Sequence, residues 1–242
     1  MHSNSVPSYS VGPWSHNPNS PKAMNFYFKF PRNPTPATNH VATSLGHMGV
    51  LINGVSLFNP SDAFSYNNQG VWNRNAYYNE KISFDKCNGH PAPNGEYHNH
   101  IDAPCLYDNK DSSKHSPLIG WLFDGYPLYG PFGYSNPNDA TSSIKRMAPS
   151  YRFRNITQRR TLPSGSVLSS SQWGPDVSNQ YPIGNYLEDY EYVANLGDLD
   201  EYNGRYCKTP EYPNGIYAYF VASNSNNEPI YPYLIGPKCK FI

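Results

Sequence analysis

The chain has 242 residues, the size of a single domain, and is long enough to bury a hydrophobic core. Charged residues make up only 15% and the formal net charge is zero, which argues against nucleic-acid binding through clustered Lys and Arg. No apolar run approaches the roughly 20 residues that a membrane-spanning helix needs. The first residues, M-H-S-N-S-V-P-S-Y, lack the apolar core of a signal peptide, so we expect a mature chain.

The composition favours strands and turns over helices. The chain contains 22 Tyr, 24 Pro and 18 Gly, and it shows neither a heptad repeat nor a long amphipathic helix. We therefore predict a mostly β fold with few short helices. Residues 1–23 are polar and Pro-rich, which predicts an extended N-terminal arm, and residues 24–242 are expected to form a single β domain whose first strand lies near 24–30.

Two similar segments predict a repeated β-hairpin. Residues 49–60 read G-V-L-I-N-G-V-S-L-F-N-P and residues 120–131 read G-W-L-F-D-G-Y-P-L-Y-G-P, with five identities in twelve positions. An Asn-Gly or Asp-Gly pair between apolar residues predicts a two-residue turn of type I′ in each. Hairpins of this type resemble one another through turn chemistry alone, but we interpret the pair as an internal repeat. The core is then pseudo-symmetric, and loop-rich insertions separate its parts.

A histidine-rich segment lies between the two hairpins. It contains His90, His98, His100 and His115, half of the eight histidines in the chain. His98 and His100 are two residues apart, so in a strand they point to the same face. Imidazole is a good ligand for copper and zinc, and the four side chains are a candidate metal site. The alternative is that these histidines donate hydrogen bonds to loop carbonyls or pack against tyrosines.

Carboxylates near this segment are weaker candidates. Glu96 precedes the histidine strand and could act as a general base on a metal-bound water. Asp124 is also a candidate catalytic group, although Asp-Gly is equally good turn chemistry. Asp198 and Asp200 lie in the run G-D-L-D-E-Y-N-G-R and are candidate calcium ligands. Their spacing does not match an EF-hand, and a hydrogen-bonded acidic turn explains the run equally well.

The four cysteines indicate disulfides. Cys87, Cys105, Cys207 and Cys239 form no C-x-x-C pair, so a thiolate zinc site is weakly supported. An even count favours two bridges, which we expect as Cys87–Cys105 and Cys207–Cys239, although three pairings are open. Disulfides predict a secreted or extracellular protein. The sequon Asn155-Ile156-Thr157 is a candidate glycosylation site.

Several motifs resemble a known family. The central tetrad reads Tyr97-His98-Asn99-His100. Other matching segments are Gly89-His90-Pro91, Cys105-Leu106, residues 115–120, residues 124–127 and Gly197-Asp198-Leu199-Asp200. Together they resemble the YHYH domain family, which is named after a Tyr-His-Tyr-His tetrad. The third tetrad residue is Asn99 here instead of Tyr. Because side chains alternate along a strand, Asn99 should face away from His98 and His100. The resemblance covers about residue 46 to the end and implies a secreted or surface domain, but it brings no established activity.

Two functional hypotheses are compatible with these observations. In the first, the chain is a secreted metal-binding domain that holds copper or zinc with its histidine cluster. Metal-dependent oxidoreductase and hydrolase chemistry both fit this hypothesis, and the residues do not select between them. In the second, the chain is an extracellular structural module, or one that recognises a glycan or a protein, and its histidines only pack. Convergence of the imidazoles on one point distinguishes the two.

Overall fold

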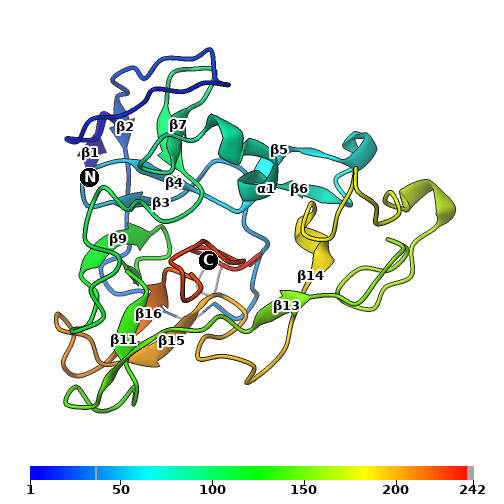
Figure 1. The fold of residues 1–242 in the computed structure, drawn as a ribbon. Helices are drawn as coiled ribbons and strands as arrows, with labels where there is room; N and C mark the ends of the chain where they lie inside the picture. The colour runs from blue at the N-terminus through cyan, green and yellow to red at the C-terminus, as the bar shows by residue number, and fades with distance from the viewer. Residues whose placement is uncertain (36, 239–242) are drawn as a thin grey trace.

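The computed structural model describes residues 1–35 and 37–238 and is mostly β, as the composition predicts (Figure 1). An eight-stranded sheet at its centre has the order β15-β16-β10-β9-β3-β4-β8-β7. Its strands are β3 (His47–Leu51), β4 (Ser56–Phe58), β7 (Gly89–Pro91), β8 (Tyr97–Asn99), β9 (Leu118–Leu122), β10 (Pro127–Tyr129), β15 (Gly204–Cys207) and β16 (Ile216–Phe220). The sheet therefore joins segments that are far apart in the sequence, from residue 47 to residue 220.

The two predicted hairpins, β3-β4 and β9-β10, lie side by side in the middle of this sheet. β3 pairs with β9 antiparallel, and Val50 stands opposite Trp121, its own equivalent in the repeat. A pseudo-twofold axis therefore passes between these two residues. Glycine at the neighbouring positions permits the close approach of the strands. A Cβ on Gly49 would lie 2.5 Å from the carbonyl oxygen of Trp121, and a Cβ on Gly120 would lie 2.6 Å from that of Val50.

Both hairpin turns differ from the predicted type I′ geometry. The Gly54 amide donates to the Leu51 carbonyl (2.8 Å) and closes a three-residue loop in which only Gly54 has positive φ (+89°). A type I′ turn needs positive φ at both central residues, so the prediction was wrong. The Asn53 side chain accepts from the Val55 amide (3.2 Å) and stabilises the alternative, a turn followed by a left-handed glycine. Gly125 (φ +89°) repeats this arrangement in the second hairpin.

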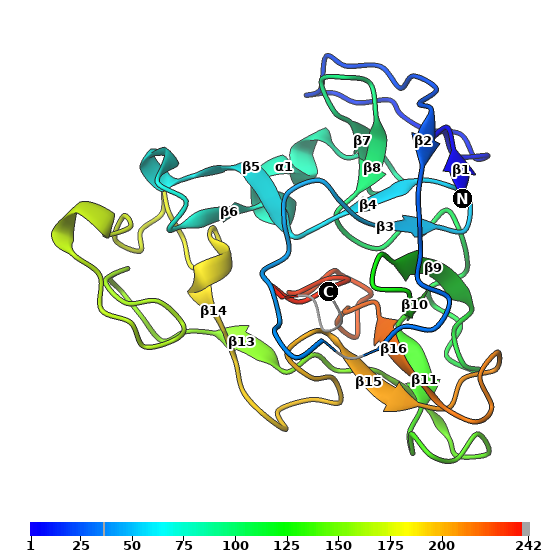
Figure 2. The ribbon, with the colours of Figure 1, turned by 180° about the vertical axis from the view of Figure 1, so that it is seen from behind.

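The duplication extends beyond the hairpins to all eight strands. β8 adds to β4, and β16 adds to β10, in both cases in parallel. β7 and β15 then complete each half as antiparallel neighbours. The turns before them share the sequence D-x-x-N-G, in which Asp85 accepts from the Tyr97 hydroxyl (3.2 Å) and Asp200 from the Tyr217 hydroxyl (2.8 Å). The sheet is thus two copies of one four-stranded unit, and both views show them one above the other (Figures 1 and 2).

Four two-stranded sheets surround the central sheet. They pair β1 (His2–Ser3) with β2 (Phe26–Tyr27), β5 (Ser61–Ser65) with β6 (Asn73–Asn75), β11 (Phe132–Tyr134) with β12 (Ile144–Arg146), and β13 (Tyr151–Phe153) with β14 (Tyr190–Tyr192). Within the described residues the single α-helix is α1 (Ala76–Glu80), and the 3-10 turns are η1 (Tyr66–Asn68), η2 (Lys81–Ser83), η3 (Ser170–Gln172) and η4 (Leu187–Asp189). None of these helices is long and apolar enough to cross a membrane.

Residues 1–23, the expected arm, run along β7 and β8 (Figure 2). The Ser5 hydroxyl donates to the Tyr97 carbonyl (2.8 Å), and the Trp14 indole donates to the Gly89 carbonyl (3.1 Å). Asn17 donates through its amide to the Pro91 carbonyl (2.8 Å). These bonds satisfy backbone groups of the histidine strands, and the arm therefore covers one edge of the central sheet.

The predicted Cys87–Cys105 disulfide is present and closes the loop that carries β7 and β8. The second expected bridge includes Cys239, which lies outside the described residues. Cys207 is buried and has no disulfide partner within the described part of the chain. One covalent link therefore holds the histidine-rich segment.

Candidate metal centre

Three of the four predicted histidines meet at one point. His90 on β7 stands directly opposite His98 on β8, and His100 follows at the end of β8. The Nε2 atom of His98 lies 3.0 Å from that of His90 and 3.1 Å from that of His100. All three ligand atoms lie within 4.8 Å of one another, and all three residues are buried. We call these residues the histidine triad.

The opposite ring nitrogen of each triad residue has a hydrogen-bond acceptor. His98 Nδ1 donates to the Glu96 carbonyl (3.2 Å) and His100 Nδ1 donates to the Asn59 carbonyl (2.6 Å). His90 Nδ1 lies 2.8 Å from the Ser83 hydroxyl, whose own proton goes to the Glu80 carbonyl (2.7 Å). The hydroxyl must therefore accept from His90. Such bonds fix the tautomer and the ring orientation of metal-binding histidines.

The consequence is that three unprotonated Nε2 atoms face one another. Burial, together with the neighbouring His100, lowers the pKa of His90 to about 3, and burial lowers the pKa of His100 to about 4. Burial also lowers the pKa of His98 well below its ordinary value, and both neighbouring imidazoles add to the effect. The rings are therefore neutral near pH 7, and no proton is available to bridge the nitrogens. A cation at their centre would relieve this repulsion between lone pairs.

A cavity of about 330 Å³ opens onto the triad and is also lined by Glu80. The Glu80 carboxylate lies 3.3 Å from His100 Nε2 and 3.8 Å from His90 Nε2, beside the group formed by the three nitrogens. Burial, followed by repulsion from Asp62 and opposed by Arg74, raises the Glu80 pKa to about 7. Its Oε2 atom accepts no hydrogen bond within the described chain. Three imidazoles and one carboxylate therefore face an accessible space.

His115, the fourth predicted ligand, lies elsewhere. It packs against Tyr129 and Phe220 of the second half of the sheet and against Tyr134 of β11, with ring centroids 4.9–5.8 Å apart. Its Nδ1 donates to the Ser116 carbonyl (2.8 Å). Because β9 continues away from β8 and pairs with β3, the residues before β9 do not fold back across the triad. The structure thus brings together three of the four predicted ligands.

The two candidate catalytic carboxylates have partners away from the triad. Glu96 Oε1 lies 2.5 Å from the Nε2 atom of His47, a histidine of β3. Asp124 is buried in its turn, where it accepts from the Tyr219 hydroxyl and the Tyr126 amide. Burial raises the pKa of Asp124 to about 6 despite both bonds. Within the described residues, the hydrogen bond from Glu96 to the triad is that of its backbone carbonyl to His98.

The remaining predicted sites lie far along the chain from the triad. Asp198 is ion-paired with Lys145 (2.6 Å), and Asp200 accepts from backbone amides of its own turn and from Tyr217. These contacts match the hydrogen-bonded acidic turn, and no group of potential metal ligands that includes Asp198 or Asp200 occurs in the described residues. The calcium expectation therefore gains no support. Asn155 is exposed, as a glycosylation acceptor must be.

Comparison with known proteins supports the resemblance seen in the motifs. A family model described as YHYH protein matches residues 27–231. The chain belongs to the YHYH family. Its tetrad, Tyr97-His98-Asn99-His100, supplies two of the three triad ligands. Among curated proteins and among solved structures, no match to this YHYH chain was found.

Sequence reasoning missed the residues that support the triad. Glu80 and Ser83 come from α1 and η2, a segment with no histidine and no motif, and Asn59 contributes only a backbone carbonyl. A partial signal for Asn59 existed, because it lies in the first repeated hairpin segment, 49–60. Their proximity to the triad depends on long-range packing, which local patterns do not reveal.

Proposed function

We propose that this YHYH protein is a secreted metal-binding protein that holds one transition-metal ion, copper or zinc, with His90, His98 and His100. The convergence of three buried, unprotonated Nε2 atoms carries this proposal. Imidazole is a favoured ligand for both metals, and the Nδ1 bonds to Ser83, Glu96 and Asn59 are the supporting contacts that such ligands require.

The open side of the triad favours a reactive centre over a closed structural site. Three protein ligands with an accessible fourth position are typical of catalytic zinc sites, whereas structural sites use four protein ligands. The cavity of about 330 Å³ gives that fourth position access to a small molecule or water. When bound, the ion would act as a Lewis acid or, for copper, as a redox centre. Glu80 is placed to accept a proton or to supply a further oxygen ligand.

Two features support the secreted location in this proposal. The Cys87–Cys105 bridge closes the loop that carries both triad strands, β7 and β8, and such disulfides persist in oxidising compartments. The exposed sequon at Asn155 is accessible for glycosylation in such a compartment. Western blotting of culture medium and cell lysate, with and without a reducing agent, tests the location and the bridge together. Retention of reduced protein inside the cell would contradict this part of the proposal.

Elemental analysis of untagged protein tests the metal centre. Wild-type protein is expected to contain about one copper or zinc ion per chain, and the double variant His98→Ala with His100→Ala is expected to contain none. The matched control is His16→Ala with His40→Ala, which removes two exposed histidines outside the triad. The proposal fails if wild-type protein stays metal-free and equally stable when both metals are added. It also fails if the control variant loses metal as the triad variant does.

A further inference from the structure

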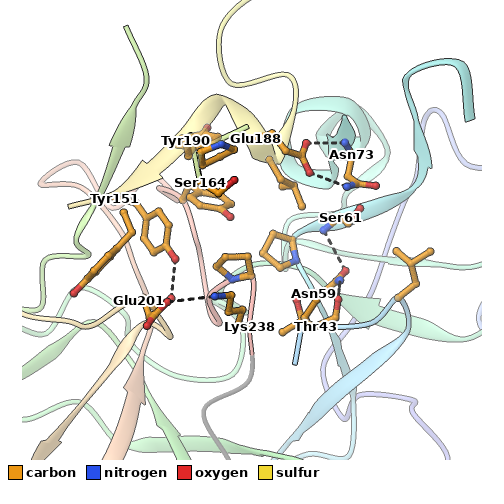
Figure 3. Close-up of a pocket in the computed structure, with 18 residues that line it drawn as sticks. Thr43, Asn59, Ser61, Asn73, Tyr151, Ser164, Glu188, Tyr190, Glu201 and Lys238 are labelled. Carbon is orange, nitrogen blue, oxygen red and sulfur yellow. Dashed lines mark hydrogen bonds and ion pairs between the residues drawn. The ribbon is translucent and has the colours of Figure 1, made fainter. Parts of the chain in front are cut away.

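A second and larger cavity, of about 610 Å³, is lined by residues of the β5–β6 pair and of the β13–β14 pair. Its lining comes from distant parts of the chain, including the segment around Asn59 on one side and η4 with β14 on the other (Figure 3). Leu45 and Ser61 line this cavity and also the cavity of the triad. The volume lies within the range of small-molecule binding sites, which is about 300–1,000 Å³. We call it the tyrosine pocket.

Aromatic side chains form a rigid wall of the tyrosine pocket. Tyr190 and Tyr231 stack with their ring centroids 4.1 Å apart, and Tyr151 packs edge-on against Tyr231 at 5.1 Å. The Tyr151 hydroxyl is held by the Glu201 carbonyl (2.7 Å). Tyr192 lies at the rim, where it is 39% exposed. These rings provide apolar surface of fixed geometry, and aromatic faces also attract cations.

Glu188 brings a carboxyl group to this wall, and no ion pair of Glu188 occurs within the described residues. Its two carboxylate oxygens accept from the backbone amide and the side-chain amide of Asn73, each at 2.7 Å (Figure 3). Burial raises its pKa to about 7, against the opposing effect of these bonds. A half-buried carboxylate that lines a cavity in this way is a place for a positively charged ligand group.

The other charged side chains around Glu188 form hydrogen bonds or ion pairs with other groups. Arg154 donates to the backbone carbonyl of Glu188 (2.9 Å) and also to Thr161. Asp189 is paired with the buried Arg159 through both carboxylate oxygens. At the mouth of the pocket, Lys238 and Glu201 lie opposite each other at 3.9 Å. The pocket therefore keeps one negative group for a ligand.

We propose that the tyrosine pocket binds a small organic amine with an apolar body. The ammonium group donates to the Glu188 carboxylate, and the apolar body packs against Tyr151, Tyr231 and Tyr192. This assignment is separate from the metal centre and does not require a bound ion. The Glu188 carboxylate disfavours an anionic ligand, and a neutral ligand would leave it with the Asn73 hydrogen bonds but no ion pair.

Isothermal titration with two matched probes tests the charge preference. Phenethylamine is cationic near neutral pH, and 2-phenylethanol has nearly the same shape without the charge. Wild-type protein is expected to bind one phenethylamine per chain and to bind 2-phenylethanol at least about tenfold more weakly. Glu188→Gln should lose this preference, so that both probes bind alike. The titrations are repeated after chelation and after addition of zinc, and both preparations should give the same result.

Two further variants make the test decisive. Glu191→Gln makes the same chemical change on β14, but Glu191 pairs with Arg152 (2.8 Å) and does not line the pocket. It should bind both probes as wild type does. Tyr192→Ala removes an exposed ring and should weaken both probes equally. Absence of phenethylamine binding to folded wild-type protein would overturn the proposal, as would equal binding of the two probes or an equal loss in Glu191→Gln. Binding that needs zinc would move the site to the metal centre and also overturn it.

Discussion

Replacing Asp124 with Asn should change how the stability of the protein depends on pH. Burial raises the Asp124 pKa from 3.8 to about 6, so the folded state holds this proton more tightly than the unfolded state. Between these values the folded chain binds more protons, and the free energy of unfolding falls as pH rises. The contribution is complete below about pH 4 and is lost above about pH 6. About two pKa units at about 1.4 kcal/mol each give a loss of about 3 kcal/mol.

The Asp124→Asn variant cannot ionise and should lack this loss. Its stability relative to wild type should therefore increase by about 3 kcal/mol between pH 4 and pH 7.5. An amide suits the turn, because Asn53 occupies the equivalent position in the first hairpin and accepts the same backbone bond. Urea unfolding of chelator-treated, disulfide-intact protein, followed by circular dichroism at several pH values, measures the difference.

The surface variant Asp111→Asn provides the control. Hydrogen bonds from Ser113, together with Lys114, lower the Asp111 pKa to about 2, so this variant should differ from wild type by a constant amount above pH 4. Parallel stability curves for Asp124→Asn and wild type would refute the reasoning, because they would mean that Asp124 titrates near its ordinary pKa in the fold.

Other predictions concern the metal centre and its support. Adding one equivalent of zinc should raise the melting temperature of wild-type protein in calorimetry and leave that of the triad variant unchanged. Ser83→Ala removes the acceptor for His90 and should weaken zinc affinity about 10- to 100-fold in competition with a chelating dye, with little change in the circular dichroism spectrum. Replacing Cys87 and Cys105 with Ser opens a loop with a sequence separation of 18 and should lower the free energy of unfolding by about 3 kcal/mol in urea titration. Unchanged affinity or stability in these measurements would contradict the assigned roles.

The sequence predicted the centre of the fold well and its extent less well. The repeat at 49–60 and 120–131 correctly indicated two related hairpins, because alternating apolar residues and Gly-containing turns are local signals. The direct pairing of Val50 with Trp121 could not be read from either segment alone. The matching D-x-x-N-G turns before β7 and β15 were visible in the sequence, but their meaning depends on strand pairings between distant segments.

The candidate site shows the same division between local and long-range information. The spacing of His98 and His100 predicted a shared face, and their Nε2 atoms are 3.1 Å apart. His115 was placed by its proximity in sequence, but the direction of β9 carries it into the other half. Glu80 reaches the triad because α1 packs there, and a lone glutamate in the sequence gives no sign of such a contact. Periodicity therefore predicted the ligands on adjoining strands, and packing decided which other groups reach them.

In the duplicated sheet, the triad positions of the first half can be compared with the equivalent positions of the second half. The strand pairings place Arg205 and Ala218 of the second half where the first half has His90 and His98, and Phe220 follows where His100 does. The same backbone frame thus folds without any of the three imidazoles. The four-stranded unit therefore does not need the three histidines in order to fold, and its second copy has other residues at their positions. Histidines introduced at those three positions would show whether strand geometry alone is enough to bind a metal ion.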